Sequence, residues 1–240
     1  MIAPSAVLLD LDGTLVDPAG AITSGIRHAL SLANIADPGE DKLRSLIGPP
    51  LTLGLAEIDG VQPHHIEKLI ADYRAVYSAT GMADSRPYPG IPEVLAALRA
   101  AGMKLYVATA KPTHLAHELL NIQGLSDAVD GVFGNADEGN GTSSSKAHIV
   151  AAVLETHGLA ADECVMVGDR LYDVEAAHEN NMASIGADWG FALEGELDAV
   201  GVGAHANDPA DLAGLLLGSH AAETIRLQIA ETLTEGAEAK

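Results

Sequence analysis

Short apolar runs alternate with helical segments from about residue 88 onward, and this alternation restricts the fold of the chain more than any other feature. Each apolar run is short enough to be a strand buried on both faces. Strands that alternate with helices are typical of a parallel sheet with helices on both sides. We expect strands at 105–108, 131–133, 164–167 and 183–186, and another at 6–9, close to the start of the chain.

The segment 17–87 interrupts this pattern, because it contains no convincing strand and its apolar residues recur at helical spacing. It follows the first strand directly, as a lid or cap would. The predicted fold is therefore α/β, a Rossmann-like parallel sheet core with an inserted all-helical cap. We assign 1–16 and 88–225 to the core, 17–87 to the cap, and 226–240 to a polar, acidic tail that frays.

The formal net charge of −21 excludes whole classes of partner. Proteins that bind nucleic-acid polymers need a basic face, and this sequence has no basic stripe. No apolar run reaches the length of a membrane span, and no basic segment precedes the first one, so we expect no membrane partner and a cytoplasmic location. The single cysteine, Cys164, excludes an intramolecular disulfide, and we interpret it as an inert core thiol.

Two carboxylates, Asp10 and Asp12, follow the first expected strand, and Gly13 and Thr14 come next. Because the carboxyl ends of parallel strands face the ligand crevice, both acids would be delivered to one site. An isolated pair of this kind is common on protein surfaces. The pair becomes a candidate for chemistry because the rest of the chain supplies complementary groups.

Thr109 and Lys146 are the first of these groups, each at a strand end or helix start where amides favour anions. Thr109 offers a hydroxyl that binds a phosphate oxygen or simply caps a helix. Lys146 follows Ser143, Ser144 and Ser145, which cap a helix. A cation in a first helical turn is unfavourable unless an anion lies beside it, although solvated surface lysines are common.

Asp169 and Asp173 form the remaining segment, at the end of the strand 164–167. Together with Asp10 they would make an oxygen-rich site, which suits Mg²⁺. Read alone, Asp173 is an ordinary acid at the start of a helix.

Taken in this order, the segments resemble the motifs of the haloacid dehalogenase superfamily of phosphohydrolases. The segment 10–14 is similar to its first motif, Thr109 to its second, Lys146 to its third, and Asp169 with Asp173 to its fourth. The helical insert is similar to the superfamily's helical, C1-type cap, so the resemblance covers nearly the whole chain. Within the superfamily, residues 47–51, 88–91 and 109–112 are similar to the phosphoglycolate phosphatase-like and bacterial 5′-nucleotidase-like branch.

The resemblance implies a Mg²⁺-dependent phosphomonoester hydrolase, a phosphatase that acts on a small phosphorylated metabolite through an aspartyl-phosphate intermediate. Asp10 would be the nucleophile, and Asp12 would protonate the leaving oxygen and then deprotonate the attacking water. Thr109 and Lys146 would hold the transferring group. The resemblance further implies a metal site made by Asp10, Asp12 through its backbone carbonyl, Asp169 and Asp173, and a phosphate- or substrate-binding set that includes Gly13, Thr14, Ala110 and Lys111.

Two other functions stay open at this stage. A phosphomutase of the β-phosphoglucomutase type shares this core and cap, and a non-catalytic binding protein could retain the fold. Dehalogenase members lack the second acid, so Asp12 favours phosphoryl chemistry. In the cap, Arg44 and Gly48 either contact the leaving group or serve as hinge and packing residues. We expect a monomer or a homodimer.

Overall fold

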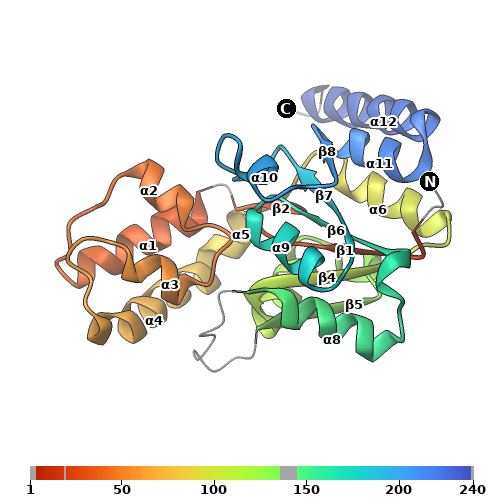
Figure 1. The fold of residues 1–240 in the computed structure, drawn as a ribbon. Helices are drawn as coiled ribbons and strands as arrows, with labels where there is room; N and C mark the ends of the chain where they lie inside the picture. Colours follow the sequence, from red (N-terminus) through yellow and green to blue (C-terminus); the bar gives the residue numbers. More distant parts are fainter. Residues whose placement is uncertain (1–3, 19, 136–144, 239–240) are drawn as a thin grey trace.

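The computed structural model describes residues 4–18, 20–135 and 145–238, with side chains described as far as 232. Six parallel strands form the core sheet in the order β5-β4-β1-β6-β7-β8 (Figure 1). Central strand β1 pairs with β4 on one side and with β6 on the other. The strands are β1 (Ala6–Leu9), β4 (Lys104–Pro112), β5 (Gly131–Asn135), β6 (Cys164–Gly168), β7 (Ala183–Ala187) and β8 (Ala204–Ala206).

Helices cover both faces of this sheet, and β1 shows why its run is apolar throughout. Successive side chains of a strand point to opposite faces. Val7 and Leu9 pack in one core cluster with α6, α7 and α11, whereas Ala6 and Leu8 pack in another with α8 and α9. The core helices are α6 (Ile91–Ala100), α7 (Thr113–Ile122), α8 (Ala147–His157), α9 (Leu171–Glu179), α10 (Glu196–Ala199), α11 (Pro209–Leu217) and α12 (Ser219–Glu238).

A separate group of helices, the cap, lies beyond the carboxyl end of β1 (Figure 1, orange). An antiparallel pair of two-residue strands, β2 (Val16–Asp17) and β3 (Arg86–Pro87), joins it to the core. The predicted fold class, a parallel α/β core with an inserted helical cap, is confirmed. The cap consists of α1 (Ala21–Leu32), α2 (Glu40–Ser45), α3 (Leu51–Ala56), α4 (Ile66–Val76) and α5 (Met82–Asp84), with a π-helical turn at Tyr77–Gly81.

The C-terminal segment differs from the fraying tail expected over 226–240, because α12 continues to Glu238. Ala222 and Ile225 are buried, and Ile229 packs beside Gly90 at the start of α6. These apolar residues recur at helical spacing on one face, so packing against the core offsets the polar composition of the segment. Among the described residues, no helix is both long and apolar enough to cross a membrane.

Candidate active site

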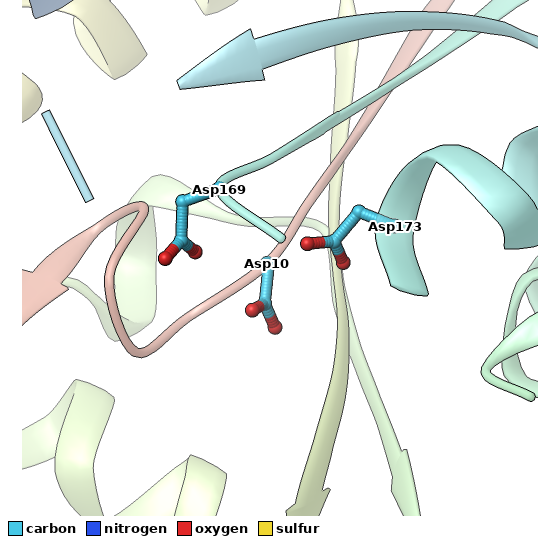
Figure 2. Close-up of side chains that lie close together, drawn as sticks. All are labelled: Asp10, Asp169 and Asp173. Carbon is cyan, nitrogen blue, oxygen red and sulfur yellow. The ribbon is translucent and has the colours of Figure 1, made fainter. Parts of the chain in front are cut away.

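Three carboxylates meet at the carboxyl ends of β1 and β6 (Figure 2). Asp10 follows β1, Asp169 follows β6, and Asp173 lies in the first turn of α9. One oxygen of each lies within 4.8 Å of the others, and all three side chains are buried. The structure therefore brings Asp10 beside two acids that lie more than 150 positions later in the sequence.

Two glycines make room for Asp169. A Cβ atom on Gly13, which has φ +92°, would lie 2.3 Å from Asp169 Oδ2, and one on Gly190 would lie 2.2 Å from Asp169 Cβ. The carboxylate itself is held on both sides, because Thr14 Oγ1 donates to Oδ1 at 3.0 Å and the backbone N–H of Phe191 donates to Oδ2 at 2.9 Å. Gly190 and Phe191 are not recognisable as site residues from the sequence, because they act through backbone proximity to Asp169, which only the folded chain creates.

Burial makes the negative charge of this cluster costly. Desolvation raises the pKa of Asp169 well above its usual value, and repulsion from Asp10 and Asp173 adds to it. Desolvation also raises the pKa of Asp173 to about 6, although Lys146 opposes the change. Of the three carboxylates, Asp10 and Asp173 share one ammonium, that of Lys146, so the cluster keeps an excess of negative charge. Hard carboxylate oxygens with unmet charge fit a divalent cation.

Lys146 lies at the start of α8, between two of these acids. Its Nζ atom is 2.7 Å from Asp10 Oδ1 and 2.5 Å from Asp173 Oδ1. Burial lowers the pKa of Lys146, but the two carboxylates outweigh that effect and leave it above its usual value. The ammonium charge is therefore retained inside the site. Of the serines expected to cap this helix, Ser143 and Ser144 fall outside the described residues, whereas Ser145 Oγ accepts from the N–H of Ala147 at 3.0 Å.

Asp12 belongs to a second buried ion pair, with Lys111. Lys111 Nζ lies 2.8 Å from Asp12 Oδ2 and donates to the hydroxyl of Tyr77 in the cap at 3.1 Å. Desolvation raises the pKa of Asp12, and Lys111 offsets part of the rise. Thr109 is buried beside this pair, and its Oγ1 accepts from the N–H of Lys111 at 3.3 Å.

A pocket lies between these groups and the cap. The core lines it with Asp10, Asp12, Thr109, Ala110 and Lys111. Gly13 and Thr14 are not among the described lining residues, and Thr14 binds Asp169 instead. The cap lines the pocket with a mainly apolar wall that also contains Arg74. The apolar and uncharged residues of this wall are Ile22, Leu46, Ile47, Gly48, Pro49, Pro50, Leu51, Thr52, Ile70 and Tyr73.

The two cap residues singled out in the sequence have different positions. Gly48 lines the pocket. Arg44 is exposed, and its guanidinium lies 5.2 Å from the ring centroid of Phe191 in the core. Arg74 is not recognisable as a pocket residue from the sequence, because it lies in a helix whose apolar spacing is explained by packing.

A family model described as haloacid dehalogenase-like hydrolase matches residues 7–187, which include the cap and every acid of the site. The chain belongs to the haloacid dehalogenase-like hydrolase family. Within it, the chain is 37% identical over 193 residues to a 5′-nucleotidase of Pseudomonas aeruginosa, covering 80% of this chain and 86% of that protein. It is 30% identical over 202 residues to a phosphoglycolate phosphatase of Rhodospirillum rubrum, covering 80% and 82%.

A solved structure extends the likeness to three dimensions. A predicted phosphatase from Clostridium acetobutylicum superposes on this haloacid dehalogenase-like chain with a TM-score of 0.83 and 32% identity, covering 90% of this chain and 99% of that one. Together with the named relatives, this confirms the predicted enzyme class, a phosphatase.

Proposed function

We propose that this phosphatase hydrolyses a small organic phosphate monoester through an aspartyl-phosphate on Asp10, with Mg²⁺ as its cofactor. One observation carries the proposal. Asp10 opens into a pocket beside a buried ammonium, a second acid and two further carboxylates. This set can attack phosphorus, move a proton and bind a cation, with Asp10 and Asp12 lining the pocket and the other groups directly beside Asp10.

The proposed reaction has two displacements. A carboxylate oxygen of Asp10 attacks phosphorus while Asp12 gives a proton to the leaving oxygen; Asp12 then takes a proton from the water that hydrolyses the aspartyl-phosphate. Thr109 and Lys146 hold the transferring group: Thr109 lines the pocket wall with Ala110 and Lys111, and Lys146 lies against Asp10. Mg²⁺ held by Asp10, Asp12, Asp169 and Asp173 would offset repulsion between the nucleophile and the phosphate. We propose that residues 17–87 act as the cap that excludes bulk water.

The direct test is phosphate release from a panel of small phosphomonoesters, with Mg²⁺ and with EDTA. The panel includes phosphoglycolate, nucleoside 5′-monophosphates and hexose phosphates. Metal-dependent release supports the proposal and ranks the leaving groups. Conversion of one hexose phosphate isomer into another without release would instead favour a phosphomutase.

Metal binding should stabilise the fold most at neutral pH. The raised pKa of Asp173, about 6 against an ordinary value of 3.8, means that the folded state binds protons more tightly than the unfolded chain. The free energy of unfolding therefore falls as pH rises through that interval, and a cation that binds the charged carboxylates offsets the loss. Saturating Mg²⁺ should raise Tm by roughly 5–10 °C at about pH 7.5 and by less at about pH 5.

Thermal unfolding monitored with and without EDTA checks this expectation. Asp169→Asn should raise Tm in the absence of metal, because it removes a buried charge, and should abolish the response to Mg²⁺. Asp72→Asn, at an ion pair with Lys68 on the cap surface, is the matched control and should leave the response intact. An equal Mg²⁺ effect at both pH values, retained in Asp169→Asn, would contradict the proposed metal site.

Arg74 supports a leaving group that carries its own negative charge. It is half-buried in the pocket wall, and no described acid lies within ion-pair distance of it. The other pocket cation, Lys111, is already paired with Asp12. Arg74→Ala should therefore raise KM for phosphoglycolate roughly tenfold, the loss of one charged hydrogen bond, and change KM for p-nitrophenyl phosphate little. Equal effects on both esters, measured beside the surface control Arg226→Ala, would refute this role.

A further inference from the structure

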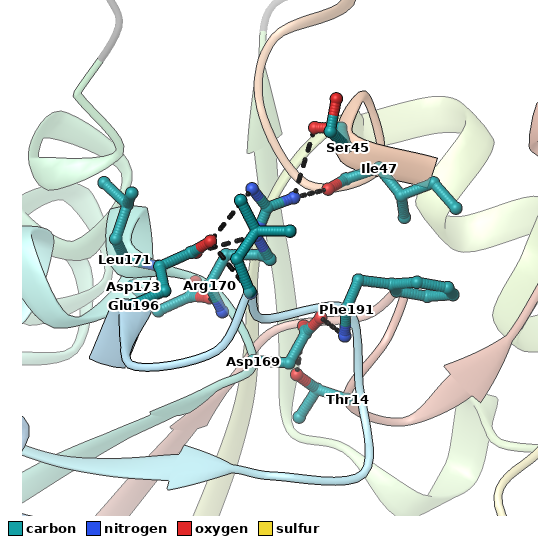
Figure 3. Close-up of polar contacts among 10 residues, drawn as sticks. Thr14, Ser45, Ile47, Asp169, Arg170, Leu171, Asp173, Phe191 and Glu196 are labelled. Carbon is teal, nitrogen blue, oxygen red and sulfur yellow. Dashed lines mark hydrogen bonds and ion pairs between the residues drawn. The ribbon is translucent and has the colours of Figure 1, made fainter. Parts of the chain in front are cut away.

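Arg170 is a buried arginine between the carboxylate cluster and the cap (Figure 3). It follows Asp169 directly and precedes α9. Its Nη1 atom donates to the backbone oxygens of Ser45, the last residue of α2 in the cap, at 3.4 Å, and of Ile47, two residues further on. The residues that follow, from Leu46 to Leu51, form one wall of the pocket. A core side chain therefore holds the start of the segment that faces the leaving group.

Glu196 fixes the guanidinium from the opposite side. Arg170 Nε donates to Glu196 Oε1 at 2.8 Å and Nη2 donates to Oε2 at 3.4 Å, and both side chains are almost fully buried. The N–H groups of Leu171 and Leu193 also donate to this carboxylate. Desolvation raises the pKa of Glu196, but these donors outweigh it and leave the pKa below its usual value. Because Glu196 already fixes the guanidinium, Nη1 of Arg170 can donate to the cap without a further loss of side-chain entropy.

Gly48 lets the cap chain cross directly over Arg170. It has φ +107°, and a Cβ atom there would lie 2.7 Å from Arg170 Cγ. Any other residue would meet both a backbone strain and a steric clash. Of the alternatives left open for Gly48 in the sequence, this contact is a packing one, made on a core arginine.

Phe191 provides a second contact to the same cap segment. Its ring lies beneath the Arg44 guanidinium, and its N–H donates to Asp169 Oδ2. The cap segment 44–48 therefore touches two core groups, and each is attached to Asp169: Arg170 through a peptide bond and Phe191 through a hydrogen bond. Both Phe191 and Glu196 lie beyond the residues that the family model matches.

We propose that Arg170 is a positioning residue that docks the cap segment 44–48 onto the core beside Asp169, and that Glu196 holds it ready to do so. Docking sets the distance between the apolar pocket wall and the phosphoryl site. The kinetic consequences rest on the proposed phosphatase reaction, whereas the docking itself does not.

Hydrogen exchange of the backbone amides tests the docking without any substrate. In Arg170→Ala, the amides of residues 44–48 and of Leu51 should exchange roughly tenfold faster or more, because two charged hydrogen bonds to the cap are lost, while β1 and β6 stay protected. Arg226→Ala removes a surface arginine that also pairs with two carboxylates, and should leave the cap amides unchanged. Unchanged exchange at the amides of residues 44–48 in Arg170→Ala would overturn the proposal.

A second variant keeps the test valid if Arg170→Ala unfolds, since that change leaves Glu196 buried without its counter-charge. The pair Arg170→Met with Glu196→Gln removes both charges and should give the same cap-confined increase in exchange; protection equal to wild type would refute the docking.

Kinetics then separate this inference from the proposed function. In the double variant, KM for the best phosphomonoester should rise about tenfold, as expected for a lost positioning contact, while kcat for p-nitrophenyl phosphate falls less than twofold. A fall in kcat for p-nitrophenyl phosphate as large as the rise in KM for the best phosphomonoester would contradict a positioning role. A wild-type protein that releases no phosphate would refute the proposed function and leave the exchange result decisive for docking.

Discussion

Asp10→Asn should abolish phosphate release, lowering kcat by roughly 10⁴-fold or more, while the protein remains folded. The substitution changes one carboxylate oxygen into an amide nitrogen, which cannot displace the leaving oxygen from phosphorus. The buried position and the volume of the side chain stay the same. Lys146 keeps Asp173 as a counter-charge, at 2.5 Å, so the ammonium is not left unpaired. Phosphate release and thermal unfolding of the variant measure the two parts of this expectation.

Unfolding of the variant is the competing explanation for lost activity; thermal unfolding tests it directly, and a matched variant controls for the chemical change itself. Asp72→Asn makes the same chemical change on the cap surface and should retain wild-type kcat. A folded Asp10→Asn protein with more than a few per cent of wild-type activity would contradict the aspartyl-phosphate route, because water would then have to attack phosphorus directly.

The sequence predicts those strands and helices whose own residues show an apolar run or a helical spacing. The strand β1 is recognisable because all four of its residues are apolar and the sheet buries both faces. The strands β2 and β3 are not, because two residues carry no alternation and pair only through the chain geometry at the cap junction. The strand β8, with three residues, is too short to recognise for the same reason, and α12 is helical because its few apolar residues meet the core.

The candidate site divides in the same way. Asp10, Asp169 and Asp173 are predictable because each follows a recognisable strand in a fold that gathers strand ends at one edge. Arg170 and Phe191 are not, because their roles depend on contacts with the cap at Ile47 and Arg44, which are more than 100 positions away. Sequence spacing therefore predicts the carboxylates that lie at the carboxyl edge of the sheet. The residues that position them depend on how the cap packs on the core, which the sequence alone does not show.

Asp12→Ala should affect formation and hydrolysis of the aspartyl-phosphate differently, depending on whether the leaving group needs a proton. With an alkyl phosphate, the leaving alkoxide needs a proton, so loss of the acid should lower kcat by roughly 10³-fold. With p-nitrophenyl phosphate, the phenolate leaves without a proton, so formation of the aspartyl-phosphate should survive. Hydrolysis of the aspartyl-phosphate should be slow, because the missing Asp12 carboxylate is also the base that activates water. The expected result is a burst of one equivalent of p-nitrophenolate followed by slow turnover.

Rapid-mixing kinetics with both esters measures this difference, and Lys111→Met supplies the matched control at the partner of Asp12. Lys111 lowers the pKa of Asp12 against the effect of desolvation, so removing it should raise that pKa and leave a proton donor in place. That variant should show no burst, because the base is still present. Equal losses for both esters in Asp12→Ala, with no burst, would mean that Asp12 acts only on charge or geometry. A burst whose phosphoryl group passes to an added hexose phosphate faster than to water would identify a mutase, since the covalent step is common to both reactions and only the acceptor differs.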